Sequence, residues 1–172
     1  MEDASKSRWI EAALKQHEAK LIRYATHILA DIERAREIVQ ETFLRLCKEK
    51  PESVDGHLPQ WLFTVCRNLA FDVRKKENRM TPLTEGIGAD VPPARDAFDH
   101  RENMSMVLRV LETLPKNQRE VVHLKFHCDF SYREISDVTG LTVSNVGFLI
   151  HTAIKSIRTQ LLPSPETVRR TQ

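Results

Sequence analysis

The sequence predicts an all-α protein with two small helical domains, a helical bundle and a helix-turn-helix domain, joined by an extended linker. Apolar residues recur at helical spacing in two blocks, residues 8–79 and 104–162. The segment between them, residues 80–103, contains three of the 8 prolines and two of the 5 glycines and keeps no periodicity. Late in the second block, a short helix, a glycine-containing turn and another helix follow one another directly. Residues 163–172 form a polar tail.

Three helices are expected in the first domain. The first has an apolar stripe on Leu14, Leu21, Ile22, Ala25 and Leu29. The second helix is expected to have Asp31 as its N-cap. Its apolar stripe holds Ile38, Val39, Thr42, Phe43 and Leu46. The third helix is expected to begin at Pro59, because proline suits the first turn of a helix, and to run to Asn78. Its expected inner stripe is Leu62, Val65, Leu69 and Val73.

The second domain contains the clearest local signals. Pro115 separates its first two helices. Ser131, with Glu134 three residues later, has the spacing of a capping box, and Gly140 suits the position just after a helix end. Thr142 then caps the last helix. The expected buried face of that helix holds Val146, Leu149, Ile150, Ala153, Ile154 and Ile157.

Charge is distributed unevenly along the 172 residues, although their net charge is only +2. Residues 1–79 contain 15 Lys and Arg against 13 Asp and Glu, and residues 104–172 contain 9 against 6. Residues 80–103 contain 2 against 5, so the linker is the acidic part. A strongly basic coat for nucleic acid is excluded, whereas a local basic patch is not.

The composition, with 41% hydrophobic and 29% charged residues, is typical of a soluble globular protein. No apolar run approaches the roughly 20 residues of a membrane helix, and the N-terminus lacks the features of a signal peptide. Cys47, Cys66 and Cys128 form no CxxC pair and lie within apolar patterns, which favours buried reduced thiols over disulfides. We therefore expect a cytoplasmic protein.

No motif supports an enzymatic function. His123 and His127 are spaced to share a helix face, but a third metal ligand is not evident because Cys128 points about 100° away on a helix. Ordinary surface histidines are the favoured interpretation. Gly86 and Gly88 lack the strand–helix context of a phosphate loop, and no nucleophile motif accompanies them. Catalytic residues, a bound metal and a cofactor are therefore not expected.

Two helix faces have patterns that fit either a binding surface or plain solvent exposure. On the third helix, the face opposite the inner stripe collects Gln60, Thr64, Arg67, Asn68, Phe71, Arg74, Lys75 and Asn78. Basic side chains around an aromatic ring fit a nucleic-acid backbone with an unstacked base. A solvated charged face explains the pattern equally well. On the second helix, the polar face with Glu37, Gln40, Glu41 and Arg45 is either exposed surface or a docking surface for a partner.

Four stretches of the chain occur in the order and spacing of one known family. They are "LIRYATHIL", "AREIVQETFLRL", "LPQWLFTVCRNLAFDVRKK" and "LETLPKNQREVVHLKFHCDFSYREISDVTGLTVSNV". They resemble the extracytoplasmic-function (ECF) sigma factors of bacterial RNA polymerase. The first two are similar to the start of the family's region 2, the third to its −10 helix and the fourth to region 4. The resemblance covers nearly everything except the linker and the termini.

The resemblance implies a cytoplasmic bacterial sigma factor, not an enzyme. Such a protein binds core RNA polymerase at its clamp and flap regions, reads the −10 and −35 elements of promoter DNA and assists promoter opening. An anti-sigma factor is implied as a further partner. The acidic linker matches a segment that threads toward the active-site and RNA-exit channels of the polymerase, where negative charge suits a basic channel.

Residue roles follow from the resemblance by position. The implied polymerase-docking residues are Glu37, Gln40, Glu41 and Leu44. Residues 51–58 match a loop that captures a flipped base. The implied −10 contacts are Ser53, Asp55, His57, Arg67, Asn68, Phe71, Asp72, Arg74 and Lys75. The implied −35 contacts are Arg133, Ser144, Asn145, Phe148, His151, Thr152 and Lys155.

The last helix departs from the family pattern. Relatives usually carry Lys or Arg at the positions of Gly147, Leu149, Thr152 and Ile154, and none of these is basic here. The face expected to meet DNA is small, polar and only mildly basic, with Phe148 as its one large apolar member. We therefore expect weak −35 binding with a shallow salt dependence. Asn145 suits adenine, and Phe148 suits a thymine methyl group.

Two other functions fit parts of the sequence. One is a different helix-turn-helix regulator, such as a response-regulator effector domain, which does not explain the motif from Trp61 to Arg74 or the clamp-like second helix. The other is an interaction module whose apolar last helix docks a protein and never touches DNA.

Overall fold

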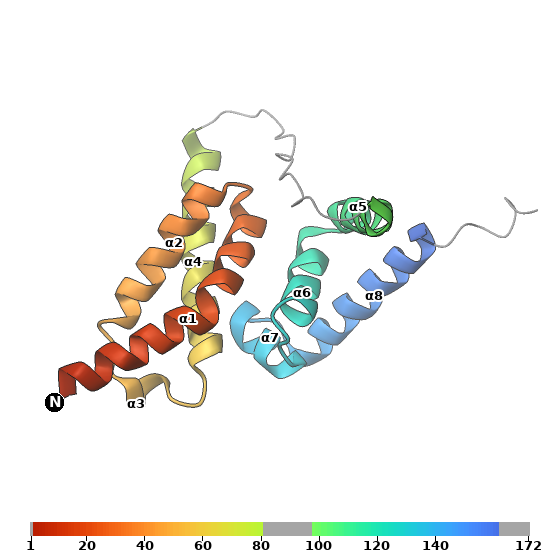
Figure 1. The fold of residues 1–172 in the computed structure, drawn as a ribbon. Helices are drawn as coiled ribbons and strands as arrows, with labels where there is room; N and C mark the ends of the chain where they lie inside the picture. Colours follow the sequence, from red (N-terminus) through yellow and green to blue (C-terminus); the bar gives the residue numbers. More distant parts are fainter. Residues whose placement is uncertain (1, 81–97, 162–172) are drawn as a thin grey trace, which may run out of the picture. The chain divides into compact units, whose positions relative to one another are not determined.

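The computed structural model describes residues 2–80 and 98–161, and every element in these ranges is a helix (Figure 1). The all-α prediction is therefore confirmed. The N-terminal domain contains α1 (Glu2–Leu29), α2 (Ile32–Leu46), α3 (Pro51–Val54) and α4 (Leu58–Met80). The C-terminal domain contains α5 (Phe98–Thr113), α6 (Lys116–Phe126), α7 (Tyr132–Thr139) and α8 (Val143–Leu161).

In the N-terminal domain, α1 and α2 form an antiparallel pair, and α4 packs against both (Figure 1). The turn into α2 is capped as predicted, since Oδ1 of Asp31 accepts hydrogen bonds from the backbone N–H groups of Glu33 (2.9 Å) and Arg34 (3.1 Å). Arg34 also forms an ion pair with Glu77 near the end of α4. The start of α2 is thereby tied to the end of α4.

The buried face of α4 differs from the predicted one. Leu62 is buried as expected, but Val65, Leu69 and Val73 are only half-buried. The other buried residues of this helix are Phe63, Cys66 and Ala70. At 100° per residue, the buried face is rotated by about 70° from the predicted stripe. The rotation follows from packing against two neighbours at once, with the ring of Phe63 contacting that of Tyr24 in α1 at a centroid distance of 5.3 Å.

Two predicted boundaries also change. The segment expected to be linker is helical from Phe98 onward, because no proline or glycine follows Pro93 to interrupt the helix before Met104. Residues 51–54 of the expected loop form the short helix α3, with Pro51 in its first turn. The rest of the predicted linker (residues 81–97) and the predicted polar tail (residues 163–172) lie outside the described residues.

The helix-turn-helix forms with the predicted caps. Oγ of Ser131 accepts from the Glu134 N–H (3.2 Å), and Oε2 of Glu134 accepts from the Ser131 N–H (2.7 Å), which is a capping box. Gly140 has φ +75°, the left-handed conformation that favours glycine after a helix. Oγ1 of Thr142 accepts from the Asn145 N–H at the start of α8. The α7–α8 turn is therefore fixed by short-range bonds.

The core of the C-terminal domain holds α5, α6 and α8 together. Leu114, Val122 and Ala153 are buried against one another, with Leu111 and Ile157 packed around them. The side chain of Arg119 closes the corner between α5 and α6, because its Nη2 donates to the backbone carbonyls of Glu112 and Leu114. As predicted, Val146, Ile150 and Ala153 form the buried face of α8. Leu149, Ile154 and Ile157 flank it half-buried.

The three cysteines are free thiols in different environments. Cys66 and Cys128 are buried as expected, whereas the expectation for Cys47 was wrong: it is the C-cap residue of α2 and is exposed. Burial raises the pKa of Cys66 to about 12, although a hydrogen bond with Thr42 acts in the opposite direction.

Only Cys47 is expected to react promptly with a thiol reagent in mildly alkaline buffer, because the thiolate is the nucleophile and the reagent must reach it. Cys66 and Cys128 should react only after the protein is denatured. Mass spectrometry of labelled peptides, taken before and after adding denaturant, measures this difference. Prompt labelling of Cys66 in the native protein would contradict it.

Candidate functional site

The outer face of α2 presents the residues predicted to dock on the polymerase. Glu37, Gln40 and Leu44 are exposed, and Glu41 is half-buried beside Arg45, whose Nε donates to Oε1 of Glu41 (3.1 Å). Leu44, with 51% of its surface exposed among charged side chains, contributes to a partner contact only as part of a larger apolar patch.

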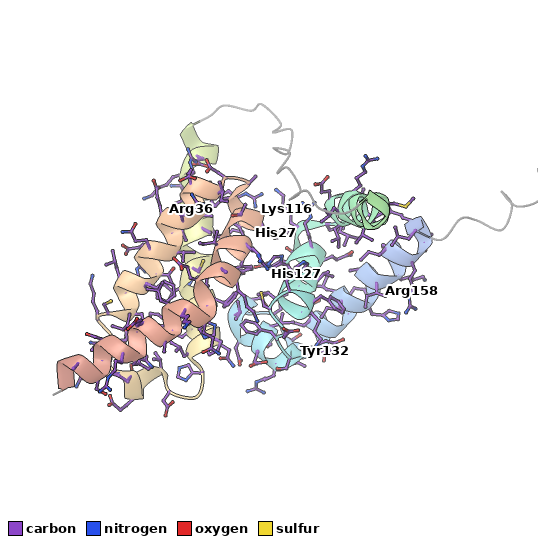
Figure 2. The ribbon with its side chains drawn as sticks, viewed as in Figure 1. His27, Arg36, Lys116, His127, Tyr132 and Arg158 are labelled. Atoms are coloured by element: carbon purple, nitrogen blue, oxygen red, sulfur yellow. The ribbon has the colours of Figure 1, made fainter. Side chains whose placement is uncertain are left out.

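A groove between α1 and α2 continues this face. It encloses about 450 Å³ and is lined mainly by the apolar residues Ile10, Leu14, Ile22, Val39, Phe43 and Leu44. Arg36, which projects from α2 in Figure 2, and Gln40 also line it. Gln40 and Leu44 thus belong both to the predicted docking set and to the groove. The contribution of α1 was missed, although the spacing of Ile10, Leu14 and Ile22 on one helix face indicates it.

The loop expected to capture a base presents polar groups to solvent. Ser53, Asp55 and His57 are all exposed. The loop is held by Val54, which is buried, and by local bonds such as that from the Gly56 N–H to Oδ1 of Asp55 (3.0 Å). Gly56 has φ +76°, so the chain turns there in a conformation that favours glycine. The polar groups therefore stand on a short, anchored turn that leads directly into α4.

The predicted −10 residues of α4 divide into two groups, because the helix is rotated from its expected orientation. Asn68, Asp72 and Lys75 are exposed, whereas Arg67, Phe71 and Arg74 are half-buried. The guanidinium carbon of Arg67 lies 4.6 Å from the ring centroid of Phe71, which is a cation–π contact.

This contact orients both side chains of the Arg67–Phe71 pair. The planar guanidinium is fixed over the ring, and each group keeps part of its surface accessible. An arginine held in this way is suited to phosphate, and a partly exposed ring is suited to stacking on an unpaired base.

The predicted −35 residues lie on the accessible side of the helix-turn-helix. Those that are exposed are Arg133, Ser144, Asn145, Phe148, His151 and Lys155. Thr152 is half-buried. Phe148 has 66% of its surface exposed, so it is not a core residue. An exposed phenylalanine in the middle of such a helix is available to an apolar group such as a thymine methyl.

Gly147 of α8 faces the side chain of Tyr132 at the start of α7. A Cβ at this position would lie 3.6 Å from Cε2 of Tyr132, and Gly147 is half-buried. Figure 2 shows Tyr132 at the end of the domain where α7 begins. Tyr132 was not among the site residues predicted from the sequence. An aromatic residue directly after the N-cap of α7 is the signal that points to it.

The histidine pair does not form a recognisable metal centre. The rings of His123 and His127 stack at 4.7 Å with 10° between their planes. Among the described residues, no group of three or more His, Cys, Asp or Glu side chains is arranged to hold a metal ion. Of the helices within residues 2–80 and 98–161, none is long and apolar enough to cross a membrane.

Two family models match the two domains in order. The Sigma-70 region 2 model matches residues 13–80, and the Sigma-70, region 4 model matches residues 104–157. The first range runs from within α1 to the end of α4, and the second contains α6, α7 and most of α8. The two matches together cover well over half of the chain.

Curated relatives are similar over most of the chain. The ECF RNA polymerase sigma factor SigL of Mycobacterium tuberculosis (strain ATCC 25618 / H37Rv) is 26% identical over 162 residues, which cover 92% of each protein. The ECF RNA polymerase sigma factor EcfG of Rhodopseudomonas palustris (strain TIE-1) is 28% identical over 124 residues, covering 72% of this chain and 68% of that protein.

A solved structure has the same fold. It is the co-crystal structure of the sigma factor RpoE in complex with the anti-sigma factor NepR from Bartonella quintana, with a TM-score of 0.68 and 21% sequence identity. The similarity covers 94% of this chain and 98% of that one. Since the family's two regions match successive domains and a curated ECF member aligns over 92% of the sequence, the chain belongs to the ECF sigma factors of bacterial RNA polymerase.

Proposed function

We propose that this sigma factor binds core RNA polymerase through α2 and the α1–α2 groove, and contacts promoter DNA through α4 and α8. The observation that carries the proposal is the order of regions 2 and 4 on two helical domains, each with most of its predicted binding side chains exposed. The protein acts as a transcription initiation factor in the bacterial cytoplasm, and the polymerase supplies the chemistry of RNA synthesis.

Within this proposal, residues 8–79 serve polymerase and −10 binding, and residues 104–162 serve −35 binding. Leu44 and the groove hold an apolar part of the polymerase, while Glu37 and Gln40 border the contact. Ser53, Asp55 and His57 hold a flipped base, at a cost of a few kcal/mol for unstacking it. The Arg67–Phe71 pair and Lys75 then hold the neighbouring backbone.

Run-off transcription with purified core polymerase tests the proposed function. The template carries the DNA upstream of the protein's own gene, together with a panel of candidate promoters, at low salt. We expect a discrete transcript only when the protein is added. Stable binding to core in the absence of DNA would also exclude an ordinary helix-turn-helix regulator. If no template in the panel gave a specific transcript, the proposal would be wrong.

Phe148→Ala is expected to lower transcription about fivefold to tenfold, because an apolar base contact at the low end of the range for base readout is worth roughly 1–1.4 kcal/mol. Phe126→Ala is the matched control, since Phe126 is 56% exposed in the same domain but lies outside the predicted recognition face. Both variants should unfold at the wild-type temperature. A large drop in the unfolding temperature of the Phe148 variant would place this side chain in the core instead.

An anti-sigma factor is a second partner that we propose, because the similar RpoE chain was solved in complex with the anti-sigma factor NepR. The exposed apolar groove between α1 and α2 is a surface that such a protein would need to cover in order to block polymerase binding. Purification of the tagged protein from its native host tests this. Recovery of polymerase subunits alone, with no other stoichiometric partner, would count against it.

A further inference from the structure

The recognition helix α8 lacks positive charge where DNA would need it. Between Val143 and Ile154 it contains no Lys or Arg, and its first cation is Lys155, in the fourth turn. A helix in the major groove normally has phosphates of both strands on its flanks, and neutralising them supplies much of the affinity. The charge for the N-terminal half of α8 must therefore come from another element.

Tyr132 of α7 lies directly over this cation-poor half. Its Cε2 and Cδ2 atoms are 3.6 and 3.7 Å from the point where a Cβ of Gly147 would stand. The ring thus packs on α8 at a position that has no side chain of its own. Tyr132 remains partly exposed, so its outer part is accessible.

Lys125 of α6 places a positive charge near this ring. Its Nζ lies 5.6 Å from the ring centroid of Tyr132 and donates a hydrogen bond to the backbone carbonyl of Phe130 (3.2 Å). The aromatic face and the carbonyl therefore hold the ammonium group from two directions. An ammonium group has three donors, so it can bind an oxygen anion without giving up the Phe130 bond.

We propose that Lys125 and Tyr132 form a phosphate-binding site for the DNA backbone beside the N-terminal half of α8. This proposal rests on the proposed function, since it assumes that α8 lies in a major groove. Lys125 supplies the charge, the Tyr132 ring holds that charge close to α8, and Gly147 leaves room for the ring. Arg133, which is exposed next to Tyr132, extends the same basic edge.

The consequence is that charge and base contact are divided between elements. In this chain α6 and α7 bring the phosphate contact, while α8 presents small polar groups and Phe148 to the bases. A phosphate contact carries no sequence information. Loss of the phosphate-binding site should therefore weaken binding to all duplexes by the same factor, whereas loss of the Phe148 side chain should change the preference among duplex sequences.

The test measures the affinity of the full chain for a fluorescent DNA duplex of mixed sequence over a range of NaCl concentrations. We expect Lys125→Gln to make the slope of log K against log [NaCl] shallower by about 0.9, the value for one phosphate contact. Lys116→Gln is the matched control. Lys116 is an exposed lysine at the other end of α6, about 14 Å away at 1.5 Å per residue, and its loss should leave the slope unchanged.

Four further variants separate the effect of charge from the effect of structure. Lys125→Arg keeps the charge and should restore the slope. Tyr132→Phe keeps the ring and should resemble the wild type, whereas Tyr132→Leu removes the ring and should approach the Lys125→Gln slope. Gly147→Ala should bind normally, because its Cβ would make only an ordinary van der Waals contact. Thermal unfolding of each variant shows whether the domain is intact.

An unchanged slope for a folded Lys125→Gln variant would overturn the proposal, as would an equal change in the Lys116→Gln control. Failure of the proposed function and failure of the phosphate-binding site give different results. If the proposed function is wrong, the wild-type protein gives no specific transcript with core polymerase. If only the phosphate-binding site is wrong, wild-type transcription is intact and the variants have the same salt slope as the wild type.

Discussion

Replacement of Leu44 by Asp is expected to lower the affinity of the protein for core RNA polymerase by at least about 30-fold, because a central apolar anchor is worth roughly 2 kcal/mol or more. Leu44 has 51% of its surface exposed and lines the α1–α2 groove, so the folded domain does not depend on it. The new carboxylate would also have to lose water to enter an apolar contact. Titration of labelled core polymerase with each variant measures the affinity.

Ile32→Asp is the matched control for the Leu44 variant. Ile32 is an apolar residue on the same helix with a similar exposure of 48%, but it lies at the opposite end of α2 and does not line the groove. It should bind polymerase as the wild type does. If both variants lost affinity equally, the loss would reflect added negative charge on α2 and the groove would not be the docking surface.

Phe63→Ala is expected to destabilise the N-terminal domain by about 3–5 kcal/mol, the usual cost of emptying a buried phenylalanine site. Phe63 is 1% exposed and its ring packs against Tyr24. Val65→Ala, at a half-buried position of the same helix, should cost about 1 kcal/mol or less. The comparison tests the rotation of α4, because the sequence pattern alone places Val65 in the core and leaves Phe63 out of it.

Urea unfolding followed by tryptophan fluorescence measures this difference in the full chain. Both tryptophans, Trp9 and Trp61, lie in the N-terminal domain, so the signal reports on that domain alone. A Val65→Ala variant as unstable as Phe63→Ala would mean that the sequence-based stripe was right and the rotated face wrong.

Short-range signals made much of the fold predictable. The N-cap at Asp31, the capping box at Ser131 and the turn at Gly140 each depend on side chains within a few residues of the backbone groups they satisfy. The apolar stripe of α8 was predictable for a related reason, since that helix has one broad buried face. Patterns of this kind survive any arrangement of distant helices.

The features that escaped prediction depend on contacts between distant segments. The orientation of α4 is set by α1 and α2 together, so its own periodicity does not determine it. The groove requires Ile10 of α1 and Phe43 of α2, which are far apart in the sequence. The packing of Tyr132 over Gly147 likewise joins two helices. The implied site residues came from family resemblance, and the structure adds which of them are accessible.

The single accessible thiol gives this sigma factor a reporter group of its own. Cys47 lies at the end of α2 and lines the same groove as Leu44, while the other two thiols are buried. A fluorophore or a photo-crosslinker attached there would need no engineered residue and would stand at the edge of the proposed docking surface. Polymerase and an anti-sigma factor could then be told apart by which of them is crosslinked, and competition between the two could be followed in real time.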